Sequence, residues 1–167
     1  GEPIGRVWSN KYGSISTIRK GQLNFTFSKA AIEWIKDVMV QKMDNQQALI
    51  LAVRVNDDRT QRLVDKAIQR ISDYQTKVKA LKGEVISDIA PKLRGWEGLA
   101  SKIYFETLNL FIPENMRFAK RSQHPALDVV NALLNYGYGI LYGKIEGALI
   151  KAGIDPYMGV FHRDDYN

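Results

Sequence analysis

The stretch TQRLVDKAIQRISDYQTKVKALK, residues 60–82, decides the fold class. Its apolar side chains recur every three or four positions, and lysines and arginines occupy the opposite face. The apolar stripe consists of Leu63, Ala67, Ile71, Tyr74, Val78 and Leu81. This period is that of an α-helix with one buried face, and Gly83 is a suitable residue to end it. The sequence therefore predicts a helix over residues 60–82.

The sequence on both sides of this stretch predicts further helices. They span about residues 28–54, 85–92, 95–110 and 128–152. Ser28 is a suitable N-cap for the first of them. Its apolar positions are Ile32, Ile35, Met39, Met43 and Ile50. Because helices account for most of the chain, we expect a mainly α fold.

The last predicted helix, residues 128–152, is apolar almost all round. A helix of this kind is expected to be central and buried on most sides. Gly139, Gly143 and Gly147 recur every four residues and form a ridge without side chains, against which another helix can lie. Gly153 is the expected C-cap of this helix, and Pro156 lies just beyond it.

Residues 1–27 differ from the rest of the chain, because they contain β-leaning pieces. Residues 4–8 and 14–18 flank the polar segment 9–13, which predicts a short hairpin or a linker. This segment is too small to be a domain. Its abrupt start suggests that a β-rich region once preceded it.

Composition limits the chemistry open to the chain. It has 167 residues, of which 45% are hydrophobic and 25% charged, as expected for one globular domain. It contains no cysteine, which excludes disulfides and thiolate metal sites, so carboxylates, histidines and water would favour Mg²⁺ or Mn²⁺. The formal net charge of +6 suits a polyanionic partner but does not identify one.

Neither a targeting signal nor a membrane span is expected. The chain opens without a basic segment followed by an apolar one. The most apolar stretch, residues 129–150, contains Lys144 and Glu146, so a buried helix explains it better than a membrane span. We therefore expect a soluble protein of a reducing compartment, the cytoplasm.

Glu97 stands out because a glycine lies on either side of the Trp96–Glu97 pair. Gly95 and Gly98 each cost a helix about 1 kcal/mol relative to alanine, and they leave room for another backbone or a ligand. The functional interpretation is a catalytic carboxylate. The simpler interpretation is an acid at a helix N-terminus, favourable to the helix dipole.

Other candidates lie near the C-terminal end and in the loop before the last helix. His162 precedes two acids and could bind a metal or act as a base, although surface histidines near acids are common. Arg117, Lys120 and Arg121 form a basic patch suited to phosphate contacts. Tyr142 and the other tyrosines of the last helix either stack on DNA or pack in the core and at its rim.

Four segments, in order, resemble the motifs of one known family. They are QKMDNQ (residues 41–46), WEGLASKIYF (96–105), RSQHPALDVVNALLNYGY (121–138) and AGIDPYMGVFH (152–162). Each is similar to a motif of the CRISPR-associated endonuclease of spacer acquisition, and residues 1–22 resemble the end of that family's β-domain and its linker.

The resemblance implies both a domain organisation and partners. Residues 1–27 would be the remnant of an N-terminal β-domain and linker, and residues 28–167 a helical catalytic domain truncated at its C-terminal end. It implies a homodimer, bridged by the second CRISPR adaptation protein, that acts on double-stranded and branched DNA.

The resemblance also implies a catalytic site. Glu97 and His162 would be catalytic residues and ligands of Mn²⁺ or Mg²⁺, which promotes attack of a 3′-hydroxyl on repeat DNA. Tyr142 matches a motif tyrosine that contacts DNA. In the family a catalytic Asp follows the His at a distance that this sequence does not reach, and Asp164 and Asp165 lie too close to His162 to match it.

Two alternatives therefore stand beside an active endonuclease and integrase. The first is a helical DNA-binding or dimerisation module without catalysis, and the second is a plain helical scaffold for a partner protein. Dependence of DNA binding on salt but not on metal would favour the first, and no DNA binding at low salt would favour the second.

Overall fold

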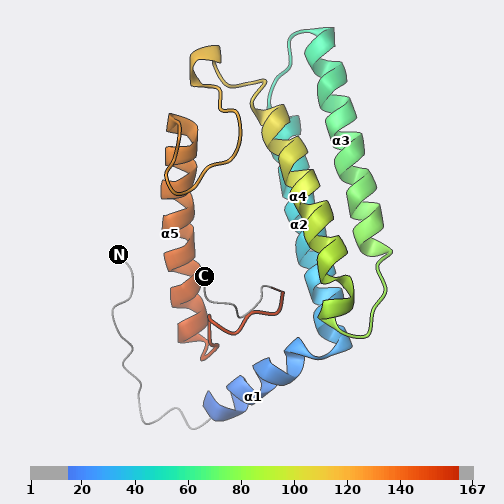
Figure 1. The fold of residues 1–167 in the computed structure, drawn as a ribbon, viewed down its shortest axis with the longest axis vertical. Coiled ribbons are helices and arrows are strands. Elements are labelled where there is room, and N and C mark those ends of the chain that lie inside the picture. Colours follow the sequence, from blue (N-terminus) through green and yellow to red (C-terminus); the bar gives the residue numbers. More distant parts are fainter. Residues whose placement is uncertain (1–14, 162–167) are drawn as a thin grey trace.

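The computed structural model describes residues 15–161, which form five α-helices and one short 3₁₀ turn (Figure 1). In chain order the helices are α1 (Ile15–Thr26), α2 (Lys29–Ala52), α3 (Asp58–Lys79), α4 (Ile86–Leu108) and α5 (Val129–Lys151). The turn η1 (Glu114–Met116) lies in the long connection between α4 and α5. The prediction of a mainly α fold is confirmed.

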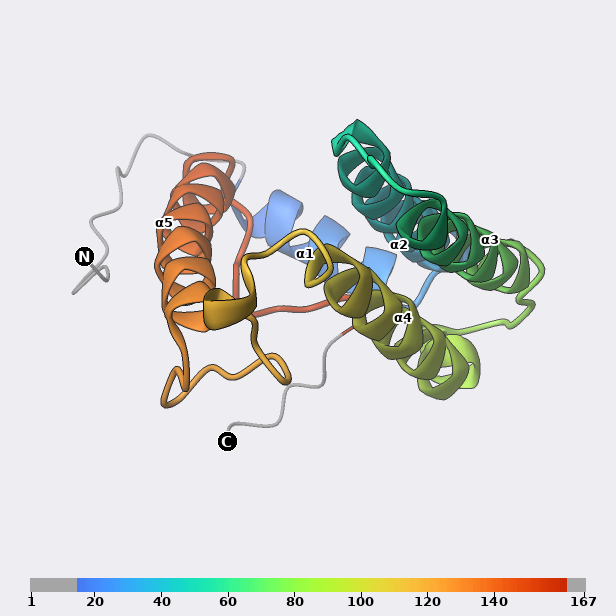
Figure 2. The same cartoon turned by 90° about the horizontal axis from the view of Figure 1, so that it is seen from above.

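Helices α2, α3 and α4 pack against one another and contain the core. Seen from above, they form one group, and α5 stands apart on the other side of the molecule (Figure 2). The residues predicted to form the apolar face of α2 are all buried. On α3 the buried positions include Val64, Ala67, Ile71 and Val78, whereas Leu63 is 46% exposed because Val64 takes its place in the core.

Polar side chains cap α2, α3 and α5 at their first turn. The hydroxyl of Ser28 accepts a hydrogen bond from the backbone N–H of Ala31 at 3.3 Å, as the sequence predicts. Asp57 caps α3 by accepting from Thr60 N–H at 2.8 Å. Asp128 does the same for α5.

Helix α4 corrects the prediction of two helices at residues 85–92 and 95–110. The chain is one continuous helix through Pro91 and Gly95. Pro91 lies in the second turn, where it removes only one backbone donor, and the buried face runs on from Ile89 through Leu93 to Ala100. Packing of this face offsets the local cost of the proline and the glycines.

Helix α1 corrects the β-leaning interpretation of residues 14–18. Residues 15–26 are helical. A helix places Ile18 and Gln22, four residues apart, on one face, and this face contacts the segment after α5. Ile18 lies against Gly153, and the Gln22 side chain bonds the backbone of Asp155 and Met158. The predicted β-piece at residues 4–8 lies outside the described residues.

Helix α5 corrects the prediction of a buried central helix. Asn131 is its single buried residue, and its large apolar side chains are widely exposed, among them Leu133 at 63%. Among residues 15–161, a Cβ added at Gly139, Gly143 or Gly147 would meet no atom of another segment within 4 Å. An all-round apolar helix needs cover on several sides, and α5 is not among the closely packed helix pairs of the described chain.

Gly153 ends α5 as predicted, directly after the C-cap residue Ala152. Gly153 has a φ of +78°, and the N–H groups of Gly153 and Ile154 donate to the carbonyls of Ile150 and Leu149. This pair of hydrogen bonds is the Schellman ending, which favours glycine at the left-handed position.

Candidate active site around Glu97

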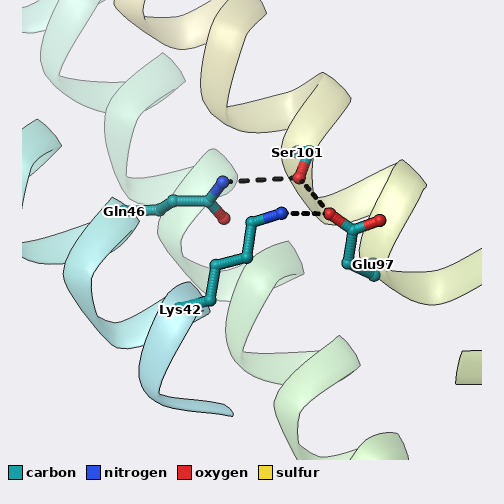
Figure 3. Close-up of polar contacts among 4 residues, drawn as sticks. All are labelled: Lys42, Gln46, Glu97 and Ser101. Carbon is teal, nitrogen blue, oxygen red and sulfur yellow. Dashed lines mark hydrogen bonds and ion pairs between the residues drawn. The ribbon is translucent and has the colours of Figure 1, made fainter. Parts of the chain in front are cut away.

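Glu97 lies on α4 where that helix faces α2, and its side chain is 26% exposed. The ammonium group of Lys42 forms an ion pair with Oε1 of Glu97 (Figure 3). The hydroxyl of Ser101 donates to the same oxygen at 3.0 Å, and the side-chain amide of Gln46 donates to Ser101 at 3.4 Å. One carboxylate oxygen is thus held by a cation and a hydroxyl at once.

Helical spacing builds this network from two pairs of residues. Lys42 and Gln46 are four residues apart on α2, and Glu97 and Ser101 are four residues apart on α4. Residues at this spacing lie on the same helix face, so the two pairs meet where the helices pack. Buried Ala100, between Glu97 and Ser101 in sequence, anchors this part of α4 in the core.

The described residues do not form a metal site by themselves. Within residues 15–161, no group of three or more His, Asp or Glu side chains is arranged to hold a metal ion. Glu97 faces a lysine where a metal site would bring further acids or histidines. His162, the second predicted ligand, lies outside the described residues.

A groove of about 850 Å³ between α2 and α5 leads to this network. Lys42 and Gln46 line it on α2, Tyr104 on α4, and Tyr138 and Leu141 on α5. Burial raises the pKa of Tyr104 above its usual value, and nearby Tyr138 acts in the same direction. Tyr104 therefore remains a neutral phenol in the neutral pH range.

The end of the described chain is bonded to α4 at Arg94. The Phe161 carbonyl accepts a hydrogen bond from Arg94 at 3.4 Å, and the Arg94 guanidinium lies 5.4 Å from the centre of the Phe161 ring. Phe161 is buried. Arg94 precedes Glu97 by three residues, about one helical turn.

The predicted phosphate contacts fall into two kinds. Arg117 and Lys120 are exposed in the loop between α4 and α5. Arg121 is instead bonded to α5, because its guanidinium donates to Asn131 at 2.9 Å and to Asn135 at 2.6 Å. It also lies 5.6 Å from the centre of the Tyr138 ring. Arg121 therefore secures the loop to the helix.

The structure brings some of the predicted residues together. Lys120 and Arg121 line one cavity with Ser101, the hydroxyl that bonds Glu97. Arg117 and Tyr142 are not among the residues that line this cavity. Tyr142 is 65% exposed on α5, with its ring centre 6.3 Å from that of Tyr138.

The sequence prediction missed the roles of Lys42 and Ser101. A signal existed, since Lys42 and Gln46 belong to the QKMDNQ motif and Ser101 follows Glu97 by four residues. The spacing shows which residues share a helix face, but not which faces meet across two helices.

The fold and the site together define a class of protein. It is an α-helical domain in which a lysine holds a carboxylate where two helices meet, and a basic loop lies beside that carboxylate. Comparison with known proteins then gives the family. The family model of CRISPR associated protein Cas1 matches residues 1–167, so the chain belongs to the Cas1 family.

Named relatives agree with this assignment. The chain is 33% identical over 174 residues to CRISPR-associated endonuclease Cas1 1 of Archaeoglobus fulgidus, covering 98% of this chain and 50% of the relative. It is also 33% identical to CRISPR-associated endonuclease Cas1 of Mycobacterium tuberculosis H37Rv, over 77% of this chain and 35% of the relative. The chain thus spans about half the length of the Archaeoglobus relative, and the part of it that aligns with the mycobacterial relative covers about a third of that protein.

A solved structure is similar as well. A chain of the partial Cas6-RT-Cas1–Cas2 complex superposes with a TM-score of 0.80 at 26% identity, covering 97% of this chain and 46% of that one. Within residues 15–161, none of the helices combines the length and apolar character that crossing a membrane requires.

Proposed function

We propose that this chain is the helical part of the catalytic region of a DNA endonuclease and integrase that inserts spacer DNA into a CRISPR array. The observation that carries the proposal is the Glu97 network. The motif glutamate stands with one carboxylate oxygen held by Lys42 and Ser101, next to a groove and a basic loop. The relatives that share this family are named endonucleases.

In this proposal residues 1–27 belong to the end of the β-domain and the linker after it, with α1 in the linker, and residues 28–167 belong to the catalytic domain. The substrates are double-stranded and branched DNA, and the working form is a homodimer joined by Cas2. Support for Cas2 comes from the similar solved structure, which is a Cas1–Cas2 complex. The net charge of +6 supports a polyanionic substrate.

The proposal includes a divalent ion, Mn²⁺ or Mg²⁺, which in such reactions acts as a Lewis acid on the phosphodiester. Glu97 would be one ligand, and His162 is proposed as another. Further ligands would have to come from outside residues 15–161, since these hold no cluster of three acids or histidines. Phe161, fixed to Arg94 one turn from Glu97, supports a role for the residue that follows it.

The residues of this chain contribute position and charge. Ser101 and Lys42 hold the Glu97 carboxylate in one orientation. Exposed Arg117 and Lys120 would bind phosphates of the DNA strand and fix its register, as basic side chains in such loops do. Arg121 and Tyr142 are further proposed contacts.

The test is strand transfer of a fluorescent 3′-hydroxyl DNA into a branched target with Mn²⁺, comparing the chain with its Glu97→Gln variant. We expect the variant to lose at least about 100-fold in rate, the loss that follows when a single preorganised group that stabilises charge is removed from a reaction centre. Glu84→Gln is the control, because Glu84 is an exposed acid that forms a surface ion pair with Lys29, away from the groove and the basic loop. Full activity of Glu97→Gln with an unchanged melting temperature would refute the assigned role.

A non-catalytic DNA-binding or dimerisation module is the second candidate. The absence of a cluster of metal ligands within residues 15–161 favours it for this chain taken alone. It is the correct description if the chain binds DNA with a steep salt dependence, joins none, and binds equally well with Mn²⁺ and with EDTA.

A further inference from the structure

A hollow of about 270 Å³ lies on the surface between α3 and α4. Leu63, Ala67, Ile103 and Leu110 supply its apolar lining. Two of these side chains remain accessible, since Leu63 is 46% exposed and Leu110 is 38% exposed. The volume lies just below the range of about 300–1,000 Å³ for small-ligand sites, so the hollow suits one inserted side chain better than a whole ligand molecule.

The hollow is separate from the groove that leads to Glu97. Helix α3 faces α2 with Ile68 and Ser72, to which the Gln47 side chain donates at 3.0 Å and 2.9 Å. The residues that line the hollow come instead from α3, from α4 and from the segment directly after α4. Helices α3 and α5 lie on opposite sides of the molecule (Figure 2). The hollow therefore opens away from both α2 and α5.

A stripe of positive charge runs along α3 beside the hollow. Arg62, Lys66 and Arg70 follow one another at intervals of four residues, so they lie on one face of the helix. All three are exposed, and Lys66 and Arg70 line the hollow. The ion pairs formed within residues 15–161 involve other cations. The charges of this stripe are therefore available to a partner.

The hollow narrows the choice among negatively charged partners. A phosphate backbone gains nothing from exposed leucines, whereas an amphipathic helix places an apolar side chain in a groove of this kind. A partner helix that lies along α3 also repeats its side chains every four residues, at steps of about 6 Å. Acids at this spacing match Arg62, Lys66 and Arg70 in turn.

We propose that this face of α3 and α4 binds an acidic amphipathic helix of a partner protein. Its carboxylates would pair with Arg62, Lys66 and Arg70, and one of its apolar side chains would enter the hollow against Leu63. Such a docking site goes beyond the proposed function, because it lies apart from Glu97 and requires neither DNA nor a metal ion.

The probe for the test is a fluorescein-labelled peptide of four EAAL repeats, about 24 Å long as a helix. Its binding to the 167-residue chain is followed by fluorescence anisotropy in EDTA and 0.15 M salt. We expect saturable binding, and the same peptide with glutamine in place of every glutamate should bind at least about tenfold more weakly. Absence of EAAL binding, or equal binding of the two peptides, would overturn the proposal.

Charge reversal on α3 tests where the acids bind. In the double variant Lys66→Glu and Arg70→Glu, two attractions become repulsions, so EAAL binding should weaken at least about tenfold. The control is the double variant Lys20→Glu and Lys82→Glu, which makes the same change in net charge at exposed lysines outside the hollow. It should change binding by less than about twofold, because salt screens distant charges. Equal weakening in the two double variants would overturn the proposal.

Leu63→Ser distinguishes a protein partner from nucleic acid. The substitution removes an accessible apolar wall of the hollow and leaves the charges in place. It should weaken EAAL binding about fivefold, and it should leave binding of a DNA hairpin unchanged. If Leu63→Ser binds EAAL normally, at an unchanged melting temperature, while charge reversal weakens peptide and hairpin alike, the face is a general polyanion surface and the proposal is wrong.

A second measurement locates the peptide, because exposed α5 is another apolar surface. One leucine of the EAAL peptide is replaced by the photo-crosslinker benzoylphenylalanine, and the modified segment of the chain is identified by mass spectrometry. We expect the crosslink in the segments that contain Leu63 or Leu110. Crosslinks confined to α5 would overturn the proposal. Glu97→Gln should bind the peptide normally, so a failure of the proposed function would leave this result unchanged.

Discussion

The Glu97 carboxylate is held by two residues from different helices, and this shapes what a single substitution does. Lys42 supplies the positive charge from α2 and Ser101 a hydroxyl from α4. The pair is only partly exposed, at 45% for Lys42 and 26% for Glu97, so its charges are less screened by water than those of a surface pair. Ion pairing here joins the two helices as well as orienting the carboxylate.

We therefore predict a measurable coupling between Lys42 and Glu97. In a double-mutant cycle of Lys42→Met and Glu97→Gln, urea unfolding should give a coupling free energy of about 1 kcal/mol, at the upper end for partly exposed pairs. The matched cycle uses Lys102→Met and Glu106→Gln, whose side chains are 70% and 61% exposed, and should give about 0.3 kcal/mol. Equal coupling in the two cycles would contradict the prediction.

At the level of residues, the sequence predicted the central carboxylate but not its partners. Glu97 drew attention because Gly95 and Gly98 beside it carry a local cost in a helix, but its catalytic role was implied by the resemblance of residues 96–105 to a family motif and stays a prediction. Arg121 was predicted as a phosphate contact from its charge alone, and its bonds to Asn131 and Asn135 needed the fold to be seen. His162 lies outside the described residues, so its role remains a prediction.

Helix α4 shows how an element can form against local signals. It begins after Val85, a residue that cannot cap a helix with its side chain. Asp88, two residues into the helix, accepts instead from the backbone N–H groups of Glu84 at 2.9 Å and Val85 at 3.1 Å. These bonds, first that of Glu84, lower the pKa of Asp88 below its usual 3.8. The helix start therefore depends on a charged carboxylate.

The pH dependence of α4 follows from the sign of this shift. Because the pKa of Asp88 is lower in the folded than in the unfolded chain, its contribution to stability is fully present above the unfolded pKa of 3.8 and is lost as the pH falls through the folded pKa. We predict that Asp88→Asn destabilises the chain most at pH 6, and progressively less below pH 4, relative to the unsubstituted chain. Urea unfolding between pH 3 and 6 measures this.

Asp57 offers an independent check of the same argument. It caps α3, and the backbone N–H of Thr60 is the first cause that lowers its pKa. Asp57→Asn should show the same pH trend. A destabilisation that does not change with pH in either variant would refute the role of the carboxylate charge.

At the level of elements, periodicity predicted α2 and α3 well, since each buries one regular face. It divided α4 in two because Pro91 and Gly95 are local breakers, and it missed the buried face that spans them. It assigned residues 14–18 to a β-piece because β-branched residues are frequent there. The contacts that Ile18 and Gln22 make with the segment after α5 favour the helix of α1.

The exposure of α5 is a property of the whole molecule. The apolar character of α5 predicted that this helix is buried. A sequence pattern does not indicate which part of a protein packs against an apolar helix. Among residues 15–161, Arg121 bonds Asn131 in the first turn of α5, and Ile18 lies against Gly153 just beyond its last turn. The chain spans about half the length of its Archaeoglobus relative, so an apolar helix without cover in this half is consistent with a larger assembly or a longer chain.

An apolar helix this exposed should make the 167-residue chain self-associate, because water-exposed apolar patches of this size rarely stay free. Leu133 is 63% exposed and lines an apolar hollow of about 370 Å³ on α5. Leu133→Glu removes a side chain whose burial is worth about 1.5–3 kcal/mol, and adds a charge that must be desolvated. In a symmetric pair the change acts twice. Sedimentation velocity should therefore show at least a tenfold weaker association for Leu133→Glu.

Leu51→Glu, at a 61% exposed leucine near the end of α2, is the matched control and should leave association unchanged. Two outcomes would show that α5 does not mediate self-association in solution. One is a chain that stays monomeric at 100 µM (a concentration that detects Kd values of about 1 mM). The other is an equal effect of the two substitutions.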